Sequence, residues 1–92
     1  MKRYVLDKEL ILNMVSDILK EFFGIADFNM DYKLKIDLGL DEIDIFDLAC
    51  DIEDTFLICF TNDEVLSWNT IDINELVNLI HIKLKKKGED KE

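Results

Sequence analysis

The 92-residue sequence has no proline, three glycines and two cysteines. Because proline is the residue that most strongly breaks helices, its absence favours long helices with the glycines at their joints. Cys50 and Cys59 are too few for a disulfide framework, and since each lies among apolar neighbours we expect two buried or half-buried thiols. A single histidine and the lack of a Cys-x-x-Cys pair argue against a zinc site.

Positive charge is missing from the middle of the chain. No lysine or arginine occurs between Lys35 and Lys83, whereas this stretch holds twelve aspartates and glutamates. The formal net charge of the whole chain is −10. A field of this sign repels nucleic acid and anionic membranes and attracts basic protein surfaces. We therefore expect a basic protein surface as the partner, and neither nucleic acid nor a membrane.

Long apolar runs are also absent, although 49% of the residues are hydrophobic. Aspartate or asparagine interrupts each apolar stretch well before it reaches the length of a transmembrane helix. The basic residues near the N-terminus are followed by Asp7, Lys8 and Glu9 before any run that resembles a signal peptide. We expect a cytoplasmic, monomeric protein with one domain over residues 1–92.

The sequence contains no recognisable catalytic set. His81 has no serine or cysteine close to it in the sequence, and nothing singles out a pair of carboxylates, so we expect no enzyme activity. Residues 27–38 begin like a calcium-binding loop, but Tyr32 stands where the turn needs glycine and Leu38 where a bidentate glutamate is needed. We therefore expect no metal site.

Apolar residues recur at three- and four-residue steps in several stretches, which predicts amphipathic helices. The predicted helices span residues 7–23, 42–56, 62–66 and 73–84. Asp41 and Asp72 fit the N-caps of the second and last helices, and Gly24 fits the left-handed residue that ends the first. Residues 88–92 are expected to fray. We predict an all-α fold, a small irregular four-helix bundle with three long helices and one short one.

A long connection at residues 25–40 separates the first two predicted helices. Its alternating "KLKID" could form a short strand, but no partner strand is evident, so we expect a loop held to the bundle by its apolar side chains. These side chains are Phe28, Met30, Leu34, Ile36, Leu38 and Leu40. Trp68, next to the short helix, is expected to belong to the lid of the core, with a partner contact as the alternative.

The second predicted helix has two opposite faces. At about 100° per residue, one face is apolar and should point into the core. It consists of Ile45, Phe46, Leu48, Ala49, Ile52 and Phe56. The opposite face carries Asp44, Asp47, Asp51 and Asp54, with Ile43 and Cys50 at its edge. Like charges at these spacings destabilise a helix by about 0.2–0.5 kcal/mol per pair. We interpret this face as a docking strip for a basic partner; the alternative is a solvated polar face.

The stretch "DLGLDEIDIFDLACDIEDTF", residues 37–56, resembles the central motif of acyl carrier proteins. The family pattern is Asp-Leu-Gly-(Ala/Leu)-Asp-Ser-Leu-Asp, then apolar and acidic residues, then Leu-Glu-(Glu/Asp)-x-Phe. Ten positions match it in type and register: Leu38, Gly39, Asp41, Ile43, Asp44, Leu48, Ile52, Glu53, Asp54 and Phe56. A looser resemblance extends over about residues 5–82. It implies the same four-helix bundle with a long first loop.

The sequence departs from the family pattern at Glu42. In the family, the serine at this position carries 4′-phosphopantetheine, whose thiol holds the acyl chain. Glutamate has no hydroxyl for that attachment, and the two serines of this sequence, Ser16 and Ser67, lack the surrounding motif. We therefore expect no cofactor. Glu42 is either a favourable first-turn residue or a carboxylate that partly imitates the family's phosphate charge at the helix N-terminus.

The hypothesis that follows is an acyl-carrier-like binding module that acts through its acidic second helix. Its partner would offer a basic surface, such as that of an acyl-transfer or synthase enzyme. The candidate partner-binding residues are Asp41, Glu42, Ile43, Asp44, Asp47, Cys50, Asp51, Glu53, Asp54 and Phe60. Two alternatives stay open: a carrier of acyl or lipid groups in fatty-acid or polyketide-type metabolism by a non-standard route, and an acidic inhibitor or immunity-type protein.

Overall fold

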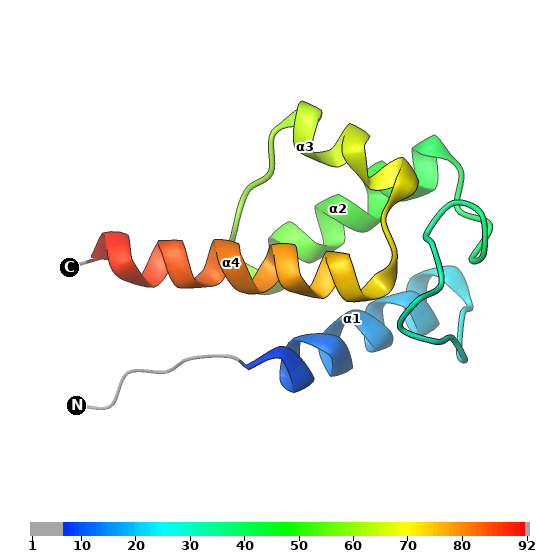
Figure 1. The fold of residues 1–92 in the computed structure, drawn as a ribbon, viewed down its shortest axis with the longest axis horizontal. Helices are drawn as coiled ribbons and strands as arrows, with labels where there is room; N and C mark the ends of the chain where they lie inside the picture. Colours follow the sequence, from blue (N-terminus) through cyan, green and yellow to red (C-terminus); the bar gives the residue numbers. More distant parts are fainter. Residues whose placement is uncertain (1–6, 92) are drawn as a thin grey trace.

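The computed structural model describes residues 7–91, with side chains described as far as residue 87. Four α-helices and one 3-10 turn follow one another along the chain, in the all-α bundle that the sequence predicts. Their bounds are α1 Lys8–Phe23, α2 Glu42–Phe56, α3 Asn62–Leu66, η1 Ser67–Thr70 and α4 Ile73–Lys91. As Figure 1 shows, α1 and α4 lie side by side and run in opposite directions, α2 packs beside them, and α3 with η1 lies above α2.

The predicted helix boundaries are confirmed where a local signal sets them. Asp7 caps α1, and the α1 helix ends at Gly24 in the left-handed conformation, with φ 69°. The side chain of Asp72 accepts a hydrogen bond from the amide of Glu75, and the side chain of Glu75 accepts one from the amide of Asp72. These reciprocal bonds satisfy amide groups that the first turn of α4 cannot pair internally.

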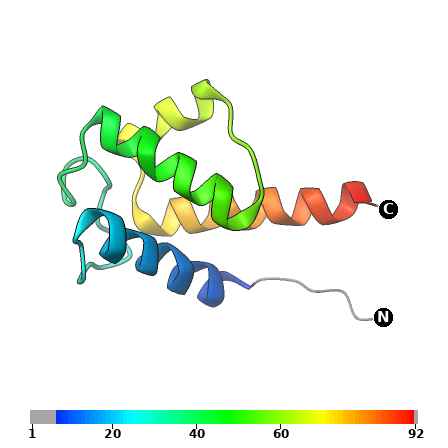
Figure 2. The ribbon, with the colours of Figure 1, turned by 180° about the vertical axis from the view of Figure 1, so that it is seen from behind.

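The last helix is longer than the sequence predicts. It continues to Lys91 rather than ending near Leu84, and in both views its final turns extend past the end of α2 (Figures 1 and 2). The prediction was wrong because it followed the apolar stripe, which stops at Leu84. Lysine and glutamate are good helix formers, and a glycine inside a helix costs only about 1 kcal/mol, so Gly88 does not stop it. Fraying of residues 88–92 stays a prediction.

The hydrophobic core lies between the helices and includes two residues of the long loop. Every element contributes buried side chains to it: Ile11, Val15 and Leu19 from α1, Leu34 and Leu40 from the loop, Leu48 and Ile52 from α2, Val65 from α3, Trp68 from η1, and Ile73, Leu76 and Ile80 from α4. The apolar stripe predicted for α2 is buried, with Phe46 only half-buried against the core. Trp68 is confirmed as a core residue, because none of its side chain is exposed.

The connection between α1 and α2 is a loop, as expected, and it is anchored to the start of α4. The amide of Leu34 donates to the carbonyl of Ile71 at 3.1 Å, and the amide of Ile73 donates to the carbonyl of Tyr32 at 3.0 Å. Leu34 and Leu40 are buried, and Phe28 and Leu38 are half-buried. One of the predicted anchors does not hold the loop, because Ile36 is 76% exposed. Met30 is 36% exposed, and its carbonyl accepts from the amide of Asn74 at 2.9 Å. A single bridge, Lys33 to Asp72, is the only strand-like pairing in the described part of the chain.

Candidate protein-binding face on the second helix

The N-terminus of α2 is fixed by two aspartates that cap each other. The Asp41 carboxylate accepts from the amide of Asp44 at 2.9 Å, and the Asp44 carboxylate accepts from the amide of Asp41 at 3.2 Å. Gly39, with φ 75°, makes the left-handed turn that brings the chain into the helix. Glu42 follows as the first helical residue and is exposed. The helix dipole and free amides favour a carboxylate there.

The outward face of α2 carries exposed acids between two exposed apolar residues. Asp47 and Asp54 are exposed, and Ile43 and Leu57 are 72% and 71% exposed at the two ends. Cys50 is exposed in the middle of this face. The predicted separation of an apolar inner face from an acidic outer face is therefore confirmed. We refer to Ile43, Asp47, Cys50, Asp51, Asp54 and Leu57 as the α2 face.

Asp51 lies between Asp47 and Asp54 on the α2 face. It is half-buried, and its pKa is raised by desolvation and then by the negative charges of Asp47 and Asp54. No lysine or arginine of α2 relieves this repulsion. A cation brought by another molecule would lower the pKa of Asp51 and stabilise its charged form. The negative charges of the α2 face are thus not neutralised by any basic residue of the same helix.

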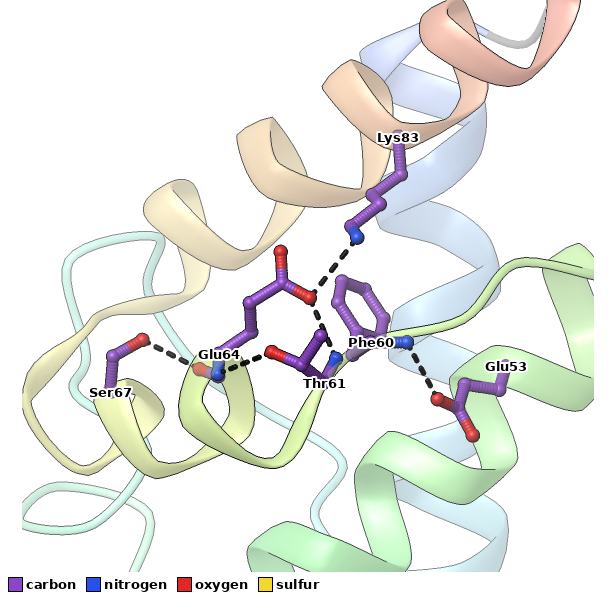
Figure 3. Close-up of polar contacts among 6 residues, drawn as sticks. All are labelled: Glu53, Phe60, Thr61, Glu64, Ser67 and Lys83. Atoms are coloured by element: carbon purple, nitrogen blue, oxygen red, sulfur yellow. Dashed lines mark hydrogen bonds and ion pairs between the residues drawn. The ribbon is translucent and has the colours of Figure 1, made fainter.

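Four of the predicted partner-binding residues make contacts within the chain. Asp44 is half-buried, and its carboxylate caps the N-terminus of α2 by accepting from the amide of Asp41. Glu53 is half-buried, and one of its carboxylate oxygens accepts from the amide of Phe60 at 2.8 Å (Figure 3). The Phe60 ring is half-buried, edge-on to the ring of Trp68 with centroids 4.9 Å apart. Asp41 is exposed but also caps the helix, so the freely exposed acids are Glu42, Asp47 and Asp54.

The expectation for the two cysteines was wrong, because both Cys50 and Cys59 are exposed. Cys50 has the apolar neighbours Ala49 and Ile52 in the sequence, but these point into the core while Cys50 points out. Helix periodicity, not the identity of adjacent residues, decides burial on a helix.

A polar cluster next to the α2 face joins α3 to α4, and nothing in the sequence analysis identified it. The Lys83 ammonium lies 3.1 Å from a carboxylate oxygen of Glu64, and 5.2 Å from the centre of the Phe60 ring. The same Glu64 oxygen accepts from the amide of Thr61 at 2.7 Å, and the Thr61 hydroxyl accepts from the amide of Glu64 at 3.1 Å (Figure 3). The amide of Thr61, and after it Lys83, lowers the pKa of Glu64.

The signal that could have found part of this cluster is Thr61 followed by Glu64. A Thr-x-x-Glu spacing before an apolar residue is the sequence pattern of a capping box. The pairing with Lys83, nineteen residues further on, depends on how α3 packs beside α4.

Between Asp7 and Lys91, no helix combines the length and apolar character needed to cross a bilayer. Over the same residues, no three histidines, cysteines or acids gather in an arrangement that could hold a metal ion.

Comparison with known proteins points to one kind of relative. No family model matches the chain. An acyl carrier protein from Cyanophora paradoxa is 32% identical over 68 residues, which cover 72% of this chain and 66% of that protein. The similar region thus spans slightly less than two thirds of the relative. The chain is an acyl-carrier-like four-helix bundle with distant similarity to an acyl carrier protein.

Proposed function

We propose that this chain is an acyl-carrier-like binding module that acts by protein–protein contact through the α2 face rather than by carrying a prosthetic group. The observation that carries the proposal is the α2 face itself. Asp47, Asp51 and Asp54 repel one another on one side of a well-packed helix, and the exposed Ile43 and Leu57 flank them. An acidic strip with apolar ends matches a partner that offers lysines or arginines around a shallow apolar patch.

The start of α2 supports the absence of an attached group. In carriers of the family that the motif resembles, a serine stands where this chain has Glu42, and a carboxylate has no hydroxyl to form the phosphodiester bond. Of the two serines, Ser16 lies within α1, and the hydroxyl of Ser67 donates to the carbonyl of Glu64 at 2.6 Å. Neither lies at the N-terminus of α2. These residues do not fit phosphopantetheine, so we assign this chain no acyl-transfer step and no enzyme activity.

Glu42 has a second reading within this proposal. Its exposed carboxylate lies at the positive end of the helix dipole, next to the Asp41 cap. A partner that recognises the negative charge of a phosphate at this position would find the negative charge of the Glu42 carboxylate in its place. We propose an enzyme or other protein with a basic docking surface as the partner, with acyl-transfer and synthase enzymes as the first candidates. The cytoplasmic location and monomeric state expected from the sequence stay predictions.

The experiment is capture of partners from an extract of the native host by the immobilised chain. The test variant changes Asp47, Asp51 and Asp54 to asparagine and leaves Asp44 intact, because Asp44 caps α2. The matched control changes Asp17, Asp27 and Asp31, three exposed acids away from α2, to asparagine. We expect the control to capture the same protein as the wild type and the test variant to lose it. Equal capture by both variants would remove the α2 face from the proposal.

The two alternative functions, a non-covalent lipid carrier and an acidic inhibitor, predict different results for the natively purified chain and the proteins that it captures. A carrier that binds lipid non-covalently between its helices would release lipid on extraction of the natively purified chain. An acidic inhibitor would capture a basic toxin or nuclease and abolish its activity in a salt-sensitive manner. The identity and activity of the captured molecule therefore distinguish these alternatives from the proposal.

A further inference from the structure

The segment of residues 57–70, which includes α3 and η1, is attached to the bundle by a small apolar surface and by side chains of α2 and α4. Its one α-helix is only five residues long, a length that is not stable on its own in water. Its inner surface consists of Ile58, Val65 and Trp68, all buried. Figure 3 shows that side chains from α2 and α4 hold its first residues in place.

The contacts that hold this segment form a ring of polar groups around Phe60. Glu53 of α2 accepts from the amide of Phe60, at 2.8 Å. From the other side, Lys83 of α4 lies 3.1 Å from Glu64 and 5.2 Å from the centre of the Phe60 ring. The Lys87 ammonium also donates to the carbonyl of Leu57. The ring of Phe60 in turn contacts Trp68, so these polar contacts close the segment over the tryptophan.

We propose that residues 57–70 open as a unit while α1, α2 and α4 stay folded, and that Lys83 is the clasp that keeps the unit closed. Lys83 makes the only ion pair among the side chains described for residues 7–87, and it joins the two parts directly. The closed state also contains an unsatisfied group, because the indole nitrogen of Trp68 is buried with no hydrogen-bond partner among the described residues. Opening gives this nitrogen access to water, which favours a measurable population of the open state.

The opened unit would have a consequence for the surface of the molecule. Trp68, Val65 and Ile58 would become accessible beside the end of α2, where Leu57 is already 71% exposed. The clasp therefore controls how much apolar surface the protein shows in this region. This inference does not depend on the identity of a partner, and it can fail or succeed independently of the proposed function.

The test is amide hydrogen exchange of the full chain carrying Lys83→Gln, with Lys86→Gln as the matched control. Lys86 is an exposed lysine of the same helix, for which the structure gives no side-chain contact. Loss of a half-buried ion pair and a cation–π contact predicts about three- to tenfold faster exchange at the amides of Val65 and Ile71. We expect the amides of Leu19 and Ile52 to exchange as in the wild type, and Lys86→Gln to change none of the four.

Fluorescence provides a second readout, because Trp68 is the only tryptophan. Quenching of Trp68 by acrylamide should increase in Lys83→Gln and in Glu64→Gln, which removes the same ion pair from the other side. Exchange that accelerates equally at all four amides would show global destabilisation and overturn the proposal. Unchanged exchange at Val65 and Ile71 would show that Lys83 is not a clasp.

Discussion

Asp41 and Asp44 cap each other at the start of α2, each carboxylate accepting a hydrogen bond from the other residue's amide, at 2.9 and 3.2 Å. The pair sets where the helix begins, whereas the buried apolar residues of α2 set which of its residues face outward. The acidic residues of this motif thus have two different structural roles. Asp41 and Asp44 build the helix, whereas Asp47 and Asp54 are exposed on it.

Removal of the Asp41 cap should destabilise the protein without altering the α2 face. We expect Asp41→Ala to lower the free energy of unfolding by about 1 kcal/mol, because the amide of Asp44 loses its acceptor. Asp41→Asn should lower the free energy of unfolding much less, since asparagine is an equally good N-cap. Urea denaturation followed by circular dichroism measures both. Equal losses in the two variants would indicate that charge, not capping, is what Asp41 contributes.

Asp51→Asn should stabilise the protein at neutral pH. It removes two like-charge pairs on α2, with Asp47 and Asp54, worth about 0.5–1 kcal/mol together. Because burial and repulsion raise the folded-state pKa of Asp51, the native state binds its proton more tightly than the unfolded state. The charged form therefore costs stability above the folded-state pKa, and the cost is lost as the pH falls through that pKa toward the unfolded value.

The advantage of Asp51→Asn over the wild type should thus be largest at neutral pH and shrink in acid. Denaturation of both proteins at several pH values measures this difference. An advantage that grows as the pH is lowered would contradict the assignment of a raised pKa to Asp51.

Leu57 ends α2 in the left-handed conformation, at φ 57°, where glycine is the usual residue. The strain of a leucine there is of order 1 kcal/mol or more, and its side chain is 71% exposed, so little packing is lost on truncation. Relief of this strain is partly offset because glycine loses more conformational entropy on folding than leucine does. We therefore expect Leu57→Gly to raise the free energy of unfolding by about 0.5 kcal/mol. A loss of more than about 1 kcal/mol would show that the Leu57 side chain packs more than its exposure indicates.

Glu42→Ser tests how much of the carrier surface this chain keeps. We expect a phosphopantetheinyl transferase to modify this variant and not the wild type, because only the nucleophile differs from the family motif at this position. Intact-mass measurement after incubation with transferase and coenzyme A detects the product. No mass gain in Glu42→Ser would mean that the recognition surface around α2 has diverged together with the serine.

The parts of the fold that the sequence predicts are those set by neighbours within one or two helical turns. Asp41 and Asp72 as caps, Gly24 as a helix end and the buried stripe of α2 each follow from a local pattern. The outward orientation of Asp47 and Asp54 follows from the same periodicity. These features supply most of the candidate site, because the site lies on a single helix.

The parts that the sequence does not predict depend on packing between distant segments. Lys83 reaches Glu64 only because α4 passes beside α3, and Glu53 reaches the amide of Phe60 only because the chain reverses at Leu57. A leucine in a left-handed position gives no signal of that reversal. Consequently the sequence placed Glu53 and Phe60 among the free partner contacts, whereas the structure uses both to hold the 57–70 segment.

As a binding module, this chain should carry no group attached at the start of α2. Mass spectrometry of the protein purified from its native host tests this most directly. We expect a peptide map in which the peptide that contains Glu42 has its unmodified mass and no peptide carries the mass of 4′-phosphopantetheine. A covalently attached phosphopantetheine on any residue of the native protein would contradict it.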